Sequence, residues 1–458
     1  MKVLGPRMNT EDGREAQGAG ACLSYSANVH AAETVDELLE CLKRHVAPIS
    51  RAAFGPRKAA ANLRLGMRQA DELLGNPVLP STSTLSDSAL RAAPGLACER
   101  LLQTLDELGL AVVSINAFPI RDFHAARVKE QVYSPPWTDG GRALYSLKIA
   151  KILAHILARQ GPQRRCAAIS VPTGVFKAQY GDSAEVREQC AHFLTECVRE
   201  LLRLETLTGL TVQLGLEPEP LTTAETCGEF IAYYKLLLDT AAAKYPRQLG
   251  VKRAQAEDIA RRFLTVNLDL CHQAAEFEDP IAALNQLRAA GIAVSGLHLA
   301  AALTLKEPAA NADALAQLKA LDEPRYLHQV IASARDGKLV RFADLPDLWQ
   351  AQRLKGRALH DFSELRCHFH MPLCLDLGAQ SALGTTRAVV GPAARFAVKE
   401  GLTNNLVVET YTWNVLAGLA ERGNAGALAL LGPSGAVDVQ AGIVKELQWA
   451  REQLRMGG

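Results

Sequence analysis

The 458-residue sequence lacks several features that would place it at once in a particular class of protein. No apolar run approaches the roughly 18 residues that a membrane-spanning helix requires, so we expect no membrane insertion. An excess of charge of one sign is also missing, because 50 lysines and arginines nearly balance 49 aspartates and glutamates. The formal net charge of +1 therefore gives no electrostatic argument for binding nucleic acid or an anionic membrane.

Paired cysteines and an apolar signal segment are missing as well. The ten cysteines are scattered without a CxxC pair, which in a chain of this length predicts reduced, buried thiols. The first 20 residues are polar and glycine-rich and have no apolar core. We therefore expect a flexible leader over residues 1–20, one domain over residues 21–458, and a cytoplasmic location.

The glycines do not form a phosphate-binding loop. The glycine-rich segment Gly418–Gly432 (GLAERGNAGALALLG) does not follow a strand and open a helix in the order that such loops require. We therefore expect no nucleotide cofactor.

What the sequence does contain is a series of short β-rich runs that mostly end in polar or ionisable residues. Most of them lack strict alternation of polar and apolar residues, which is typical of parallel strands buried on both faces. The eight runs are Leu23–His30, Leu110–Phe118, Ala167–Thr173, Thr211–Glu219, Leu264–His272, Val294–Leu299, Leu365–Met371 and Asn405–Tyr411.

Helical patterns lie between these runs, beginning with the capping box Thr34–Glu37. Strands that alternate with helices eight times predict an α/β fold, a single (β/α)8 TIM barrel. Long connections after the first and sixth strands predict insertions there, and helices are expected around Arg57–Leu74 in the first of them. Because loops after barrel strands build the active-site face, both insertions are candidate lids.

Four ionisable residues stand at or near the ends of different expected strands. Glu217, Asp269, His298 and Glu409 should converge in one ring, because the carboxyl ends of barrel strands meet at one face. Carboxylates that are buried without partners are costly to desolvate, and a divalent cation removes that cost. A mixed oxygen and nitrogen ligand set suits Zn²⁺ or Mn²⁺. The sequence therefore predicts a metal site built from these four residues.

A second group of polar residues would surround this site. Arg366, His368 and His370 alternate along the expected seventh strand, so all three can point inward. Asn116 ends the expected second strand. His30 either lines the pocket or caps the following turn, and His328 either reaches the barrel mouth from a lid or is a solvated helix residue.

The order of these residues resembles the xylose isomerase-like barrel superfamily, which includes sugar epimerases and the endonuclease IV group. The segment Leu268–His272 (LDLCH) matches the Asp-x-x-His at a strand end in that superfamily. More narrowly, the chain resembles the EboE-like metabolite-traffic proteins. The matching segments are Leu23–His30, Phe118–Trp137, Pro324–Val330, Arg366–Pro372 and Val407–Trp413.

The resemblance implies an isomerase or epimerase in which Glu217 and Glu409 both hold the metal and move protons on either side of a substrate carbon. The metal would polarise the carbonyl group and stabilise an enediolate. His272 would hydrogen-bond the substrate, while Arg366, His368 and His370 would contact its oxygens or a phosphate. Asn116, His30 and His328 would complete the substrate-binding set.

The expected substrate is a small polyhydroxylated or carbonyl metabolite in a pathway that processes or traffics a secondary-metabolite precursor, and other proteins of the same gene cluster are candidate partners. One alternative is a barrel that binds such a precursor and hands it over without turnover. An endonuclease IV-like phosphodiesterase is disfavoured, because it would need further histidines where the expected second and third strands offer Asn116 and Ser170.

Overall fold

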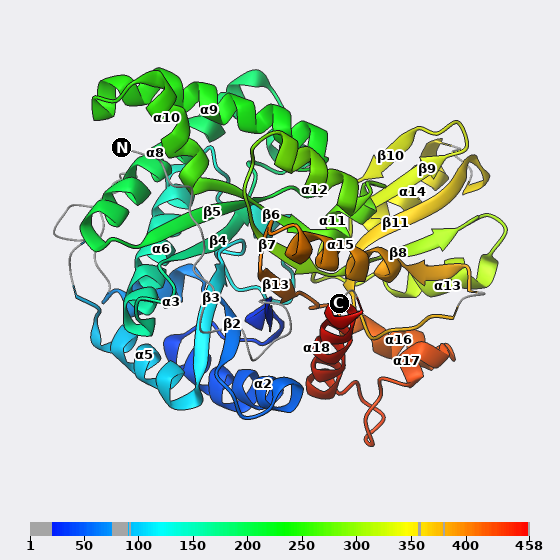
Figure 1. Cartoon of the computed structure of the whole chain (residues 1–458). Helices are drawn as coiled ribbons and strands as arrows, with labels where there is room; N and C mark the ends of the chain where they lie inside the picture. Colours follow the sequence, from blue (N-terminus) through cyan, green and yellow to red (C-terminus); the bar gives the residue numbers. More distant parts are fainter. Residues whose placement is uncertain (1–20, 76–89, 91–92, 356–358, 379–380, 457–458) are drawn as a thin grey trace.

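Eight parallel strands frame the chain in the computed structural model, which describes residues 21–75, 90, 93–355, 359–378 and 381–456 (Figure 1). The sheet order is β1-β13-β7-β6-β5-β4-β3-β2, and a parallel bridge between Ser26 and Asn62 joins the two end strands. The fold is therefore a (β/α)8 barrel. Its strands are β1 (Cys22–Tyr25), β2 (Ala59–Arg64), β3 (Leu110–Asn116), β4 (Cys166–Pro172), β5 (Thr211–Glu217), β6 (Leu264–Asp269), β7 (Val294–Leu299) and β13 (Asn405–Val408).

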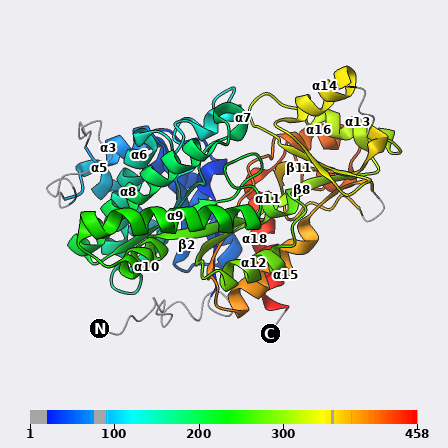
Figure 2. The ribbon, with the colours of Figure 1, turned by 90° about the horizontal axis from the view of Figure 1, so that it is seen from above.

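Helices cover the outside of the barrel, and local sequence signals fix where they begin and end. Helix α8 (Ala184–Thr208) starts after the N-cap Ser183, whose side chain accepts from the amide of Val186, and stops at Gly209 with a φ of 69°. Helices α8 and α9 run side by side (Figure 2). The other long helices of the outer layer are α2 (Ala47–Phe54), α5 (Leu96–Leu108), α6 (Gly140–Gln160), α9 (Cys227–Leu249), α10 (Arg253–Phe263), α12 (Pro280–Ala289), α15 (Arg387–Lys399) and α18 (Val439–Arg455).

A second, antiparallel sheet lies beside the barrel and is formed by the chain between β7 and β13 (Figures 1 and 2). Strand β7 leads directly into β8, and the strand order of this sheet is β10-β9-β11-β8-β12. Helices α13 (Ala312–Ala320) and α14 (Leu345–Lys355) accompany it. Its strands are β8 (Ala301–Lys306), β9 (Val330–Ala334), β10 (Leu339–Phe342), β11 (Phe362–Met371) and β12 (Leu383–Thr385). We refer to residues 301–385 as the inserted sheet.

The structure corrects the sequence interpretation of one barrel strand. The run Leu365–Met371, expected as the seventh barrel strand, belongs to β11 of the inserted sheet, where it pairs antiparallel with β8 and β9. Its alternation of side chains is typical of an antiparallel strand rather than a parallel barrel strand. The missing barrel strand is β2, which lies within the segment where helices were expected.

Strand β2 has the sequence AAANLR, and all six residues are buried. Alanine favours helices and is depleted in strands, so neither propensity nor β-branching indicates a strand here. Because β2 precedes β3, Asn116 ends the third barrel strand and Ser170 lies on the fourth. Each residue therefore stands one strand later in the barrel than the sequence predicted.

Two other expectations concern the chain as a whole. All ten cysteines are free thiols, and seven of them are buried as expected, whereas Cys22, Cys166 and Cys374 are only partly buried. Within the described ranges, none of the helices combines the length and apolar character that crossing a membrane would require. The expected leader over residues 1–20 lies outside the described residues.

Candidate metal centre

Four acidic and imidazole side chains meet at the carboxyl end of the barrel. Glu217 and Asp269 are the last residues of β5 and β6, His298 lies in β7, and Glu409 directly follows β13. In the strand register, His298 pairs with Asp269 of β6 on one side and with Val407 of β13 on the other. One ligand atom from each of the four lies within 4.8 Å of every other, and all four side chains are buried. The barrel thus brings together the predicted metal-binding set.

His298 is the centre of this cluster, which we call the carboxylate site. Its Nδ1 atom lies 3.0 Å from Oε1 of Glu217 and 2.7 Å from Oε2 of Glu409. Oδ2 of Asp269 is 3.6 Å from the same nitrogen, which is too long for a hydrogen bond. Three carboxylate oxygens therefore surround one imidazole nitrogen, and the four side chains are at most 5% exposed.

Asp269 has one oxygen in use and one without a partner. Its Oδ1 accepts from the amides of Cys271 and His272, at 2.6 and 3.3 Å, and so caps the short helix α11 (Leu270–Ala275). Its Oδ2 is buried and has no hydrogen-bond partner among the described residues. An orphaned buried carboxylate oxygen that faces two further carboxylates fits a bound divalent cation.

Glu409 is held from its other side by two amides. Asn28 and Asn116 each donate a side-chain N–H to Oε1 of Glu409, both over 2.9 Å. These bonds leave Oε2 turned toward His298. The structure therefore places Asn116, expected to contact substrate, against a ligand of the carboxylate site.

The electrostatics of the carboxylate site favour positive charge at its centre. Burial would lower the pKa of His298, but the carboxylates of Glu409 and Glu217 raise it well above its ordinary value. Burial raises and nearby imidazoles lower the pKa of Asp269, and the net result lies below its ordinary value. The pKa of Glu409 is also lowered, because His298 outweighs the effect of its burial. The negative potential of these carboxylates would also stabilise a divalent cation.

Asn267 orients the imidazole of His298 from behind. Its amide group lies 3.0 Å from Nε2, the ring nitrogen that points away from the carboxylates. A metal ligand at Nδ1 requires the proton on Nε2, and the oxygen of the Asn267 amide can accept it after a half-turn of that group. Such outer contacts commonly fix the tautomer of metal-binding histidines.

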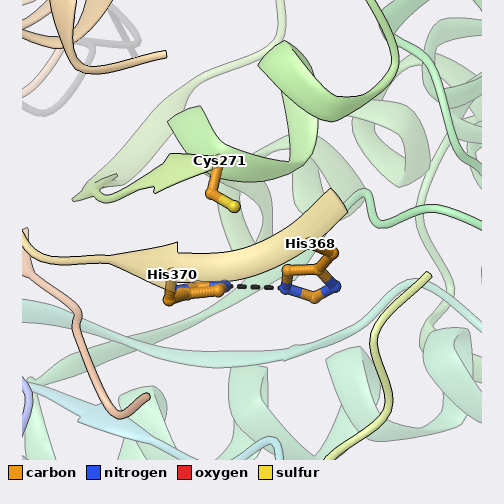
Figure 3. Close-up of side chains that lie close together, drawn as sticks. All are labelled: Cys271, His368 and His370. Carbon is orange, nitrogen blue, oxygen red and sulfur yellow. Dashed lines mark hydrogen bonds between the residues drawn. The ribbon is translucent and has the colours of Figure 1, made fainter. Parts of the chain in front are cut away.

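Three further histidines form a second cluster beside the first. His272 comes from α11, and His368 and His370 come from β11 of the inserted sheet. The Nε2 atom of His368 is 3.0 Å from Nε2 of His272 and 2.7 Å from Nε2 of His370. The third separation, between His272 and His370, is 3.4 Å. Figure 3 shows the two imidazole rings of β11 side by side.

Three other residues that were expected at the site lie apart from its cavity. Arg366 bonds Glu364 and the carbonyl of Ala274, and its guanidinium lies 4.0 Å from the ring centroid of Phe277. It therefore does not share the direction of His368 and His370.

His328 is buried rather than solvated. Its Nδ1 lies 3.1 Å from the carbonyl oxygen of His368, and its ring stacks on Phe369 with centroids 3.8 Å apart. It supports β11 from outside the cavity lining.

His30 ends the turn after β1, where its Nε2 is 3.0 Å from the hydroxyl of Tyr25. Its ring stacks on His45 at 4.4 Å. Burial, together with the neighbouring His45 and His124, lowers the pKa of His30 to about 3. It therefore stands as a neutral packing residue outside the cavity lining.

Sequence reasoning missed Glu219, which lies two residues beyond Glu217 and lines the same cavity. It accepts from the hydroxyl of Tyr133 over 2.7 Å and lies 3.5 Å from Nδ1 of His368. Burial raises the pKa of Glu219 to about 7, although His272 and Tyr133 act in the opposite direction. The Glu-x-Glu spacing of Glu217 and Glu219 could have indicated this residue, because side chains two positions apart lie on the same side of an extended chain.

Both clusters border one cavity, whose empty space is about 540 Å³ when the open solvent at its mouth is included. One half of its lining is polar and contains Glu217 and Glu409 of the carboxylate site together with the three histidines. The other half is largely apolar. That half is formed by Phe118, Pro119, Phe123, Val128, Val132, Tyr133, Tyr326, Leu327 and Tyr411.

Neither a model of a known protein family nor a curated protein sequence matches this chain. Among solved structures, it is similar to the probable 3-DHS dehydratase AsbF involved in petrobactin synthesis from Bacillus anthracis. The identity is 13%, over 60% of this chain and 73% of that one, with a TM-score of 0.32.

The chain is also similar to a xylose isomerase-like TIM barrel/4-hydroxyphenylpyruvate dioxygenase fusion protein. The identity is 13% over 90% of this chain, and the match spans only 42% of the fusion protein, with a TM-score of 0.35. Both TM-scores lie below 0.5, so the xylose isomerase-like and the EboE-like resemblances stay expectations from the sequence.

Proposed function

We propose that this chain is a divalent-metal-dependent enzyme of the isomerase or epimerase type, which moves a proton on the carbon next to a carbonyl group. The observation that carries the proposal is the convergence of Glu217, Asp269, Glu409 and His298 within 4.8 Å of one another. All four side chains are buried, and Glu217 and Glu409 line the cavity. Zn²⁺ and Mn²⁺ suit this mixed ligand set.

The two glutamates are the proposed proton carriers, because both line the cavity and end different barrel strands. A metal held at the carboxylate site would supply Lewis-acid polarisation of a substrate oxygen. Glu217 would take the proton, and Glu409 would return one from the other side. Asn28 and Asn116 would keep the Glu409 carboxylate aimed while it does so.

The cavity lining narrows the substrate that we propose. A small molecule with a carbonyl or hydroxyl group at the polar end and an apolar portion against Phe118, Phe123 and Tyr326 fits both halves. Lys129 is the cation that the described lining offers, and it is already paired with Asp344 at 2.5 Å. We therefore favour a neutral metabolite over a sugar phosphate. Its place in a secondary-metabolite pathway, with partners from one gene cluster and in the cytoplasm, follows from the sequence resemblance alone.

The first test is metal content. Protein dialysed against Mn²⁺ or Zn²⁺ and freed of excess ions should retain metal by elemental analysis, and His298→Gln should lose the equivalent bound at the carboxylate site. His192→Gln, which changes a histidine on the outer helix α8, is the matched control. Equal metal content in all three proteins would contradict the proposal.

The second test is proton exchange in deuterated water, followed by NMR on a panel of small α-hydroxycarbonyl compounds with and without an apolar substituent. Wild-type protein should incorporate deuterium next to the carbonyl, and Glu409→Gln should abolish incorporation while ligand affinity changes little. Tight binding without exchange by the metal-loaded wild type would instead identify a carrier that hands over its ligand unchanged.

A further inference from the structure

We propose that His272, His368 and His370 form a second divalent-metal site, which we call the histidine site. It lies where the inserted sheet meets the barrel. This inference goes beyond the proposed function, which rests on the carboxylate site alone and gave these three residues only contacts with substrate. The histidine site draws two of its three ligands from β11, outside the barrel.

The spacing of the three Nε2 atoms fits a zinc site. In a tetrahedral zinc site with Zn–N distances of about 2.0–2.1 Å, the ligand nitrogens lie about 3.3 Å from one another. The three Nε2 atoms are separated by 3.0, 2.7 and 3.4 Å. Small movements of a few tenths of an ångström would bring all three into that geometry.

Hydrogen bonds on the outer side of the rings fix which nitrogen of His272 and of His370 carries the proton. Nδ1 of His272 lies 2.9 Å from the carbonyl oxygen of Pro218, and Nδ1 of His370 lies 2.9 Å from that of Glu409. A carbonyl oxygen only accepts, so each Nδ1 must carry the proton of the neutral ring. Both Nε2 atoms then present lone pairs to each other.

The ring of His368 is likewise held with its proton on Nδ1. Nδ1 of His368 lies 2.8 Å from Oε1 of Gln329. The amide nitrogen of Gln329 is committed elsewhere, because it donates to the hydroxyl of Tyr133 and faces the carbonyl of Pro220. The oxygen must therefore face His368, and the three inward nitrogens are all acceptors. With all three rings neutral, three buried lone pairs this close are unfavourable, and a divalent cation bound between them would remove that cost.

Asp269 offers the fourth ligand. Its orphaned Oδ2 lies 3.8 Å from Nε2 of His370, and the same oxygen belongs to the carboxylate site. A carboxylate placed in this way can bridge two metal ions, which in such pairs lie about 3.5–4 Å apart. The histidine site then offers three nitrogens and one oxygen, a set that suits Zn²⁺.

Cys271 is not the fourth ligand in this assignment, although its sulfur lies near both imidazoles of β11. Figure 3 draws Cys271 on the opposite side of the β11 ribbon from the two rings. Burial keeps the pKa of the Cys271 thiol well above its ordinary value. We assign it to packing of α11 on β11.

The backbone of β11 is bent where it delivers its ligands. His370 has a φ of 44°, and the register of β11 against β8 shifts between Cys367 and Met371. A non-glycine residue in this conformation carries strain that surrounding contacts must hold in place. The strain falls on a residue of the histidine site, where it aims the ring at His272.

The test is metal counting on the full-length protein loaded with Zn²⁺. Wild type should hold two equivalents, and the His368→Gln, His370→Gln double variant should hold one. His298→Gln should also hold one, at the histidine site. His360→Gln, which changes an exposed histidine just before β11, is the matched control and should hold two.

X-ray absorption distinguishes which site remains, because the zinc left in His298→Gln should be surrounded mainly by nitrogen. The zinc left in the double variant should be surrounded mainly by oxygen. One equivalent in wild type, unchanged in the double variant, would overturn the histidine site and leave the proposed function standing. The converse result, nitrogen-ligated zinc that His298→Gln does not alter and nothing at the carboxylate site, would refute the proposed function alone.

His272→Gln tests the histidine site without changing the inserted sheet, because His272 belongs to α11 of the barrel. It should lose the same equivalent as the double variant. Circular dichroism and a thermal melt check that each variant is folded. If the variants do not fold, the X-ray absorption spectrum of wild type alone still decides whether a zinc ion with mainly nitrogen ligands is present.

Discussion

Asn116 donates its side-chain amide to Oε1 of Glu409 over 2.9 Å, although the two residues stand on different barrel strands. Asn28 donates to the same oxygen. The two bonds point Oε2 toward His298 and so shape the carboxylate site from a distance.

Asn116→Leu removes one of these donors from a buried carboxylate. Bonds to charged groups contribute about 1.5–3 kcal/mol, and loss of such an outer contact typically weakens metal binding about 10- to 100-fold. We expect a loss in that range, measured by competition with a chromophoric chelator. Asn62→Leu is the control, because Asn62 is also buried in the barrel but donates to Ser114. Equal metal affinities in the two variants would contradict this role for Asn116.

Metal should stabilise the protein, because three buried carboxylates otherwise face one another. Binding at a free concentration 100-fold above Kd adds about 2.7 kcal/mol to the free energy of unfolding. Thermal melts should shift upward with Mn²⁺ or Zn²⁺ and return after chelation.

Asp269→Asn separates ligation from helix capping in the same melts, since an amide oxygen can still accept from the amides of Cys271 and His272. We expect the variant to fold but to lose most of the metal-dependent shift. An undiminished shift would mean that Asp269 Oδ2 binds no metal.

Glu446 should make stability depend on pH. It is fully buried in α18, and burial raises its pKa to about 8 from an ordinary 4.5, although bonds from Leu373 and Thr410 oppose this. The folded state therefore keeps a proton that the unfolded state loses. Its contribution is complete below about pH 4.5, falls as pH rises toward 8, and is constant above that.

Glu446→Gln should flatten this part of the pH profile and stabilise the protein at pH 8, on the order of a few kcal/mol at about 1.4 kcal/mol per pKa unit. Urea unfolding between pH 5 and 8.5 measures the effect. Glu452→Gln, an exposed change on the same helix, is the control. Parallel profiles for the two variants would rule out the protonated Glu446.

Lys129 and Asp344 tie the loop over the cavity to the inserted sheet. Their side chains are 5% and 14% exposed and lie 2.5 Å apart. Breaking a buried pair by removing one partner costs about 3–5 kcal/mol, and we expect the lower end because Asp344 is partly exposed.

A double-mutant cycle with Lys129→Met and Asp344→Asn measures the coupling by urea unfolding. Asparagine retains the oxygen that accepts from the amides of His328 and Leu345. A coupling of about 1–3 kcal/mol is expected, and a value near zero would show that the pair does not hold the loop. Lys338→Met, in an exposed pair, should leave the unfolding midpoint unchanged.

The barrel was predictable because most of its strands are short apolar runs that end in ionisable residues. The exceptions follow from local composition. Strand β2 consists largely of alanine, so its sequence favours a helix, and only its position between β1 and β3 makes it a strand. Strand β11 has a strong β pattern, but a pattern along one strand does not say which sheet the strand joins.

The carboxylate site was predictable in membership, since each of its residues stands at the end of a strand. Its supporting contacts were not, because the bond from Asn28 to Glu409 joins residues 381 positions apart. Although these three histidines were expected around one substrate, the direct contact of His272 with His368 and His370 was not predictable. It depends on the docking of the inserted sheet, which sequence spacing does not encode.

Among the residues that the structure describes, the barrel closes through a single bridge, between Ser26 and Asn62, whereas its other neighbouring strands share several paired residues. This seam is the place where the sheet has the fewest hydrogen bonds to break, so its amides should exchange with solvent deuterium before those of β5 and β6. Asn28 follows β1 at the seam and holds Glu409. Local opening there would release the Asn28 amide from the Glu409 carboxylate. The rate of hydrogen exchange at this seam and the metal affinity of the carboxylate site should therefore vary together.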